Sequence, residues 1–255
     1  MQSNINRKFT WFIQKIINGD IVKRSENYWS KNKGQFSGQR GFVIGNGPSL
    51  NSADLTKLKN EITIASNKIY LIFDKTSWRP TLFTIADRIL WKKIKNEVYN
   101  HFNEVIISSS LFNIPRKDKT IFFRNLGYSE SMHAFSPNII EGVFGSRTVT
   151  YINIQIAVHL GLNPIYLIGC DHYYKNEENV TEKNRVTEHH GESNHFVPNY
   201  REEGEKVNYA PIDIMTKGYE KAKKYCDNNN IRIFNATRGG YLEVFERVNF
   251  DKLFN

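Results

Sequence analysis

Short apolar runs alternate along most of the chain with segments whose apolar positions recur every three or four residues. The runs are typical of buried strands, and the segments between them are typical of helices. Their order indicates an α/β fold with a Rossmann-like, mostly parallel sheet and helices on both faces. The predicted strands are Phe42–Ile44, Ile62–Ser66, Thr81–Asp87, Glu104–Ser110, Thr120–Asn125, Pro164–Asp171 and Ile231–Thr237, and the predicted helices are Ser52–Leu58, Ile89–Phe102, Arg147–Leu160 and Met215–Asn228.

The turn after the first strand is tight and polar, with the sequence Gly45-Asn46-Gly47-Pro48-Ser49. Glycine lets the backbone approach a ligand closely, and the N–H groups of such a turn, with the Ser49 hydroxyl, suit phosphate oxygens. The turn lacks the third glycine of the dinucleotide fingerprint and the Gly-Lys-Ser/Thr of a P-loop. It therefore predicts phosphate or nucleotide binding, with an ordinary strand–helix turn as the alternative.

Small polar side chains follow the other predicted strands as well. Ligands of parallel α/β sheets bind beyond the carboxyl ends of the strands, so these residues are expected to share one crevice. Asn, Ser and Thr offer uncharged hydrogen bonds that suit a base and a ribose, although any one Asn is more often a turn former. The strand ends are Ser66-Asn67, Asp87, Gly169-Cys170-Asp171-His172 and Asn235-Ala236-Thr237.

A long polar segment over residues 172–208 interrupts the alternation of strands and helices. Connections of this length are usually lids or disordered stretches, and we expect a flexible lid over the crevice. The segment holds His172, His189, His190 and His195, four of the seven histidines. Because their spacing matches no known zinc motif, no metal site is predicted.

The first 40 residues carry eight Lys and Arg against two Asp and Glu, within a chain of net charge +9. Apolar residues at helical spacing from Ile5 to Ile17 predict a basic amphipathic helix in a separate segment 1–40, followed by a nucleotide-binding domain 41–255. Residues 1–33 would touch an anionic membrane surface, or would pack on their own domain or on a second subunit in a homo-oligomer. Nothing outside this segment indicates nucleic-acid binding.

Composition narrows the setting of the protein further. The chain is 40% hydrophobic and 24% charged, as in globular proteins, and its two cysteines favour a reducing compartment. It has neither a long apolar stretch nor a signal-peptide pattern. We therefore expect a cytoplasmic protein, associated at most with the inner face of the cytoplasmic membrane.

Three stretches resemble a known family, namely VIGNGPSL from Val43, IASN from Ile64 and LGLNPIYLIGCDHYY from Leu160. They resemble bacterial lipooligosaccharide sialyltransferases. They equally resemble a broader superfamily with the same Gly-x-Gly-Pro-Ser-Leu turn, which includes motility-accessory flagellin glycosyltransferases and hydroxymethylpterin diphosphokinase-like proteins. The resemblance extends from Phe42 to Phe245, and FNATRGGYLEVF at its end is closer to the broader superfamily.

The resemblance to sialyltransferases implies a CMP-sugar donor, no required cofactor or metal, and an inverting transfer to a glycan or glycolipid acceptor. A lid histidine would be the base, for which His195 is the best match, and Tyr173, Tyr174 and Arg147 would assist the departing phosphate. The donor-binding residues implied by the resemblance are Asn46, Gly47, Ser49, Asn67, Ser146 and Thr148. The strand-end residues Gly45, Asp87, Gly169 and Asp171 are further donor-binding candidates.

Two other functions remain open from the sequence. A hydroxymethylpterin diphosphokinase-like enzyme would bind ATP and Mg²⁺, with Asp87 and Asp171 as metal ligands. A non-catalytic nucleotide-binding adaptor of surface-polysaccharide assembly would need no such groups. The absence of a lysine from the first turn disfavours the kinase, and the lid histidine with its paired tyrosines disfavours the adaptor.

Overall fold

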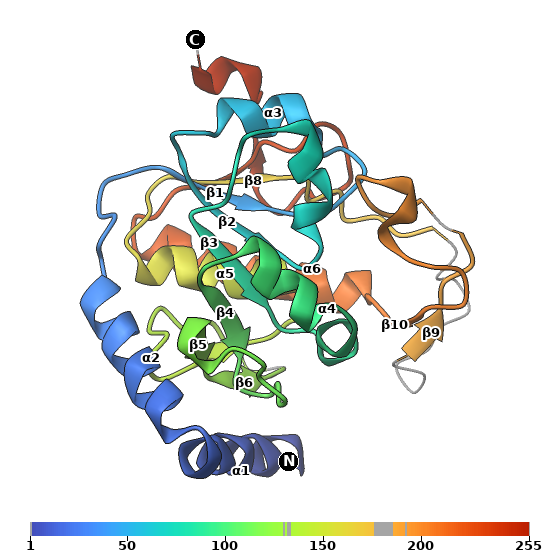
Figure 1. Cartoon of the computed structure of the whole chain (residues 1–255). Helices are drawn as coiled ribbons and strands as arrows, with labels where there is room; N and C mark the ends of the chain where they lie inside the picture. The colour runs from blue at the N-terminus through green and yellow to red at the C-terminus, as the bar shows by residue number, and fades with distance from the viewer. Residues whose placement is uncertain (1, 130, 132–133, 176–185, 192, 255) are drawn as a thin grey trace.

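A single eight-stranded sheet forms the centre of the computed structural model, which describes residues 2–254 except 130, 132–133, 176–185 and 192 (Figure 1). The strands run in the order β12-β11-β8-β1-β2-β3-β4-β5, and every pair of neighbours is parallel. The strand bounds are β1 Gly41–Ile44, β2 Ile62–Ser66, β3 Leu82–Ile85, β4 Val105–Ser108, β5 Thr120–Phe123, β8 Ile165–Ile168, β11 Ile233–Asn235 and β12 Glu246–Arg247. The predicted parallel α/β sheet is thus confirmed.

The strand order reverses between β1 and β8. From β1 the chain adds β2 to β5 on one side, and then returns to add β8, β11 and β12 on the other. The connections after β1 and after β8 therefore diverge and leave a crevice at the carboxyl ends of the two strands. This switch point is where the structure places the turn after β1 and the Gly169–His172 segment.

Helices cover both faces of the sheet, as predicted, because successive strand residues point to opposite sides. Phe42 and Ile44 belong to the core beneath α3 (Ser52–Lys57) and α4 (Arg88–His101), whereas Val43 belongs to the core beneath α5 (Val149–His159) and α6 (Ile212–Asn228). Most residues of α5 are buried all round the helix. This explains why α5 has little amphipathic pattern.

The N-terminal segment forms two helices, α1 (Gln2–Ile17) and α2 (Gly19–Asn32), where the sequence predicted only the first. Helix α2 lies along the edge strand β5: Trp29 Nε1 donates to Phe122 O at 2.7 Å, and Phe122 N donates to Ser25 Oγ at 2.7 Å. These bonds satisfy backbone groups that an edge strand otherwise exposes. The domain boundary at residue 40 stays a prediction, but Trp29 on its N-terminal side is fully buried in the core.

Several small elements were not predicted from the sequence. The connections contain the 3₁₀ turns η1 (Ile69–Lys75), η2 (Lys117–Lys119), η3 (Pro198–Tyr200) and η4 (Asp251–Phe254), and two short strands, β6 (Asn125–Gly127) and β7 (Val143–Phe144), pair in parallel beside the main sheet. Within the predicted lid, β9 (Val186–Glu188) and β10 (Lys206–Asn208) form an antiparallel pair.

The described part of the predicted lid is tied to the body of the protein. Glu205 is buried, and its carboxylate lies 3.6 Å from the ammonium nitrogens of both Lys68 and Lys93. Lys68 also donates to the carbonyl oxygen of Tyr200 at 2.6 Å. Residues 186–208, apart from 192, thus form a folded flap, whereas 176–185 and 192 lie outside the described residues.

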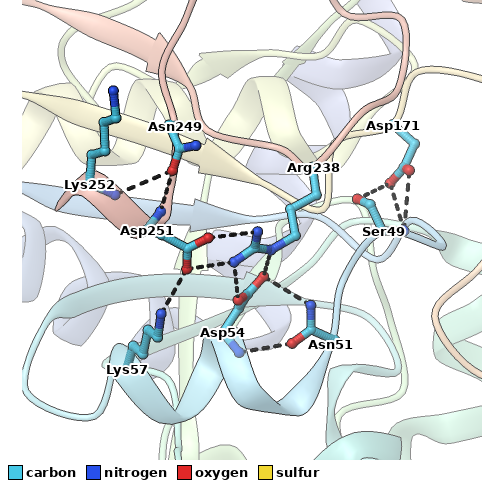
Figure 2. A network of polar contacts seen from close by, with 9 residues as sticks. All are labelled: Ser49, Asn51, Asp54, Lys57, Asp171, Arg238, Asn249, Asp251 and Lys252. Atoms are coloured by element: carbon cyan, nitrogen blue, oxygen red, sulfur yellow. Dashed lines mark hydrogen bonds and ion pairs between the residues drawn. The ribbon is translucent and has the colours of Figure 1, made fainter. Parts of the chain in front are cut away.

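A charged network joins α3 to the C-terminal part of the chain (Figure 2). Arg238, which follows β11, makes two hydrogen bonds of 2.7 and 2.8 Å to Asp54 and two of 2.9 and 2.8 Å to Asp251. Lys57 donates to Asp251 at 2.7 Å, and Asn51 caps α3 by accepting from Asp54 N. The network fixes the helix that follows the turn after β1.

We predict that Arg238→Ala lowers the free energy of unfolding by about 1–3 kcal/mol, because it leaves the largely buried Asp54 carboxylate without its cation. The loss of stability is smaller than for a fully buried pair because the Arg238 side chain is 41% exposed, so water screens its charge. Urea denaturation measures the change. Lys223→Ala removes an exposed pair with Asp227 and serves as the control, with an expected change below about 0.5 kcal/mol. Equal effects of the two substitutions would contradict a structural role for the network.

Candidate active site

A cavity of about 470 Å³ opens at the carboxyl ends of the strands, at the switch point between β1 and β8. Its wall is built from the residues after β1, β2, β3 and β8, from the start of α5 and from the flap. Twelve of the fourteen residues predicted from the sequence border it, namely Gly45, Asn46, Gly47, Asn67, Asp87, Arg147, Thr148, Gly169, Asp171, Tyr173, Tyr174 and His195. Ser49 and Ser146 do not.

The glycines of the turn after β1 make room for protein rather than for a ligand. A Cβ on Gly45 would lie 2.2 Å from the carbonyl oxygen of Gly169, and a Cβ on Gly47 would lie 1.8 Å from a carboxylate oxygen of Asp171. Gly45 N donates to Ile168 O at 2.8 Å, and Gly47 N donates to Gly169 O at 2.9 Å. These amides already hold the turn after β8, so the structure does not support the prediction that they bind a phosphate.

Ser49 is likewise engaged within the protein. Its hydroxyl donates to Asp171 Oδ2 at 2.8 Å, and its backbone N–H donates to Asp171 Oδ1 at 3.2 Å (Figure 2). The Asp171 carboxylate thus occupies the place that a phosphate was expected to take. Burial raises the pKa of Asp171, and the hydrogen bonds from Ser49 oppose this rise by stabilising the anion. The assignment of Ser49 as a ligand contact is corrected accordingly.

The start of α5 provides an alternative position for an anion. Arg147, Thr148 and Thr150 border the cavity, and the Thr148 side chain caps the helix by accepting from Thr150 N at 3.2 Å. The amino end of a helix carries partial positive charge and attracts anions. Arg147 has a φ of 59°, a left-handed conformation that is uncommon for arginine.

Ser146, immediately before this turn, has a packing role. Its hydroxyl is buried and donates to Ile214 O at 2.8 Å, and a Cβ on Gly218 would lie 2.3 Å from Ser146 Oγ. Ser146 therefore joins the start of α5 to α6, and its position outside the cavity wall does not support its predicted role as a donor-binding residue.

Three arginines surround the cavity, at Arg88, Arg147 and Arg201. Only Arg147 was predicted from the sequence. Arg88 follows the predicted Asp87 directly, so proximity to that strand end could have indicated it, whereas Arg201 lies in the flap with no signal in its sequence. The two carboxylates in the wall are both engaged: Asp171 binds Ser49, and Asp87 Oδ1 accepts from Ile89 N, Leu90 N and Asn208 Nδ2. The wall therefore favours an anionic ligand.

Three buried acceptor atoms in the cavity residues lack a hydrogen-bond partner within the described part of the chain. They are Asn46 Oδ1, Asn67 Oδ1 and His172 Nδ1. An unsatisfied buried acceptor costs about 1–3 kcal/mol, so such atoms commonly mark a place where a ligand or water donates. Asn67 and His172 also have left-handed backbones, with φ of 59° and 56°.

His195 stacks face to face on Tyr200, with ring centroids 3.8 Å apart. Burial, together with the nearby charges of Arg201, His189 and Lys68, lowers the pKa of His195 to about 3. The imidazole is therefore neutral at pH 7 but a weak proton acceptor. Tyr173 is half exposed and lies against Tyr241 with centroids 5.4 Å apart, while Tyr174 is partly buried in the wall.

No group of three His, Cys, Asp or Glu side chains within the described residues is arranged to hold a metal ion. Cys170 and Cys226 are both buried, and burial raises the pKa of each thiol to about 12. Neither cysteine is a candidate nucleophile or ligand in this state.

Comparisons with known proteins place the chain in a family. A family model described as 6-hydroxymethylpterin diphosphokinase MptE-like matches residues 18–177. Among solved structures, the chain is similar to the MAf glycosyltransferase from Magnetospirillum magneticum AMB-1, with a TM-score of 0.53 and 16% sequence identity. The comparison with curated proteins gave no match.

The structural similarity covers 91% of this chain and 38% of that glycosyltransferase, so this chain spans well under half of its length. At this identity the likeness shows a common fold, in agreement with the predicted Rossmann-like architecture. The family model covers more than half of the chain. The protein therefore belongs to the 6-hydroxymethylpterin diphosphokinase MptE-like family, within the superfamily that its turn and strand motifs predicted.

Proposed function

We propose that this protein is an inverting glycosyltransferase that takes a sugar from a CMP-linked donor, sialic acid or a related keto sugar, and transfers it to a glycan of the bacterial surface. The observation that carries the proposal is the cavity at the switch point, where three arginines and the amino end of α5 surround buried amide acceptors. This combination suits a ligand with one anionic group and several N–H or O–H donors. A nucleoside monophosphate ester has this chemistry.

The parts of the donor match different parts of the wall. Arg147 and the first turn of α5 suit the phosphate, because guanidinium groups and helix amino ends both stabilise phosphate oxygens. The amide oxygens of Asn46 and Asn67 suit the amino group of cytosine or the ribose hydroxyls. One phosphate needs less charge neutralisation than a diphosphate, so arginines can serve without a metal ion.

Transfer requires the bond between the sugar carbon and the phosphate oxygen to break, and its electron pair leaves with CMP. The acceptor hydroxyl bonds to the sugar carbon from the opposite face and loses its proton to a base. Tyr173, Tyr174 and Arg147 border the cavity and would stabilise the departing phosphate. The flap that holds His195 would limit the access of water.

The family model favours a second candidate, an ATP-dependent diphosphotransferase. Such an enzyme needs carboxylates free to bind Mg²⁺. Asp171 is held by Ser49 through both carboxylate oxygens and Asp87 Oδ1 caps α4, so the Asp171 carboxylate would have to exchange existing hydrogen bonds for metal coordination. The existing hydrogen bonds of these carboxylates support the CMP-dependent reaction over the diphosphotransferase. The third candidate, a non-catalytic adaptor, would show no turnover.

We predict that CMP raises the melting temperature without Mg²⁺ by about 5–10 °C when present at roughly 100 times its Kd. UDP, GDP and ATP should have smaller effects. Differential scanning fluorimetry with each nucleotide, with and without Mg²⁺, gives the comparison. Stabilisation by ATP only with Mg²⁺ would support the diphosphotransferase, and no response to any nucleotide would overturn nucleotide binding.

We predict that Arg147→Gln weakens CMP binding by about 10- to 100-fold, because a charge-assisted hydrogen bond to phosphate is lost. Isothermal titration calorimetry measures the affinity. Arg116→Gln is the matched control, because Arg116 pairs with the exposed Asp118 and does not border the cavity. Unchanged affinity in Arg147→Gln would place the phosphate elsewhere.

We also propose that α1 contacts an anionic membrane surface. Gln14 on one side of the helix is fully buried and donates to the carbonyl oxygens of Ser109 and Leu111, both at 2.9 Å. Other side chains of α1 are exposed and apolar, namely Phe9, Phe12, Ile16 and Ile17, each more than half exposed. The excess of basic residues in the first 40 complements anionic lipid. Within the described residues, no helix is both long and apolar enough to cross a bilayer.

We predict that the protein sediments with vesicles containing phosphatidylserine and that Phe9→Glu with Phe12→Glu abolishes this, while the melting temperature is unchanged. Vesicles of phosphatidylcholine alone should bind much less protein, because the electrostatic part of the attraction is missing. Analytical ultracentrifugation of the same variants tests the alternative that this face joins two copies. A dimer that the substitutions dissociate, without vesicle binding, would contradict the membrane contact.

A further inference from the structure

A second cavity, of about 590 Å³, is bordered by His172, which also borders the donor cavity. It is formed by one face of α6 and by the segment after Gly240. Charged residues of both signs border it, together with an exposed tyrosine: Glu220, Lys223, Lys224, Asp227, Tyr241 and Glu243. His172 is the residue that borders both cavities. The His172 side chain is therefore close to both cavities.

The hydrogen bonds of Thr216 define the tautomer of His172. The Thr216 hydroxyl lies 2.8 Å from Ile212 O and 2.7 Å from His172 Nε2. A hydroxyl has one hydrogen, and the carbonyl oxygen of Ile212 can only accept it. Both bonds form together when His172 Nε2 carries the hydrogen and donates it to Thr216. Nδ1 of the neutral ring then bears the lone pair.

Nδ1 is the nitrogen that has no partner among the described residues. Burial lowers the pKa of His172, which keeps the ring neutral at pH 7. The ring is also held by an edge contact with Tyr219, with centroids 5.5 Å apart. An oriented and unpaired lone pair is required of a proton acceptor, and because Nδ1 is buried, a hydroxyl reaches it only after a small shift of the wall around the ring.

The backbone just before His172 is held by two contacts of Asp171. The Asp171 side chain is bound by Ser49, and Asp171 O accepts from Tyr241 N at 2.8 Å. A Cβ on Gly240 would lie 2.8 Å from both Cα and O of Asp171, so this contact has no room for a side chain. Strain at a left-handed histidine persists where its surroundings hold it in place, and such positions are frequent at functional sites.

We infer that the second cavity holds the sugar acceptor and that His172 Nδ1 takes the proton from its attacking hydroxyl. The inference rests on the proposed glycosyl transfer. As the acceptor oxygen bonds to the sugar carbon, its proton passes to Nδ1 and the phosphate leaves with the electron pair of the broken bond. His172 becomes an imidazolium, which then releases the proton to solvent.

The chemistry of the second cavity suits a sugar acceptor. Tyr241 is 69% exposed and contacts Tyr173, which borders the donor cavity, so the two rings connect the cavities along one surface. Aromatic faces bind the apolar sides of sugar rings, and carboxylates such as Glu220 accept hydrogen bonds from sugar hydroxyls. His172 borders this cavity and His195 does not, and the pKa of His195 is lowered to about 3. His172 is therefore the histidine that contacts the acceptor.

The first test needs no substrate. Two-bond ¹H–¹⁵N spectra of the full chain labelled in histidine, recorded at pH 7, report which ring nitrogen carries a proton. His172→Asn assigns the signals, and asparagine tolerates the left-handed backbone. We expect hydrogen on Nε2 alone for His172, a mixture of tautomers in Thr216→Val, and the original pattern in Thr216→Ser. A proton on Nδ1 in the unmodified protein would overturn the inference.

The second test measures CMP release from CMP-sialic acid with lactose as the hydroxyl acceptor. His172→Asn should lower turnover by about 100-fold or more, with CMP affinity unchanged, and the loss of turnover in His195→Asn should be at least tenfold smaller. Loss in His195→Asn with full activity in His172→Asn would overturn the assignment in favour of His195. No turnover by the unmodified protein would count against the proposed donor, and the tautomer measurement would then decide on His172 by itself.

Discussion

The site depends on the contact between the turn after β1 and the turn after β8. Two adjacent parallel strands end side by side, and their connections must diverge without leaving backbone groups unpaired. The structure solves this by placing the Asp171 carboxylate against the hydroxyl and N–H of Ser49, over a Gly47 that has no side chain. The turn after β1 therefore makes its contacts within the protein. These contacts fix the shape of the cavity, and they leave the glycine amides of the turn without a free hydrogen for a phosphate.

Residues from the C-terminal part of the chain hold these two turns in place. Arg238 holds the helix after the first turn to the end of β11, and Tyr241 binds the backbone just before His172. Positive charge at the cavity comes from the start of α5 and from the arginines around it. The site thus has two parts. The hydrogen-bonded turns after β1 and β8 form its floor, and charged side chains from α4, the start of α5 and the flap form its wall.

Much of the fold was predictable because buried parallel strands are short continuous apolar runs, and β2 matches its predicted bounds of Ile62–Ser66. Helices α4 and α5 begin where Asp87 and Thr148 provide caps, which are local signals. Helix α2 was missed because its few apolar positions, such as Trp29, acquire meaning only against β5, which lies far along the chain.

The strand ends indicated where the cavity lies, but they did not indicate which side chains are already hydrogen-bonded within the protein. Whether a serine hydroxyl is available depends on tertiary partners, Asp171 for Ser49 and Ile214 O for Ser146, and no local pattern encodes them. Arg201 was missed for the same reason, because the flap brings it to the cavity through the burial of Glu205.

The position of α2 has a consequence for anyone who shortens the chain. This helix shields one border of the central sheet, and the opposite border ends in β12, a strand of only two residues. Removing residues up to 32 would leave the N–H and C=O groups of β5 open to strands from other molecules. A truncated version designed to eliminate the basic arm would then aggregate, even with the crevice at the strand ends intact, so the basic residues are better removed by substitution than by truncation.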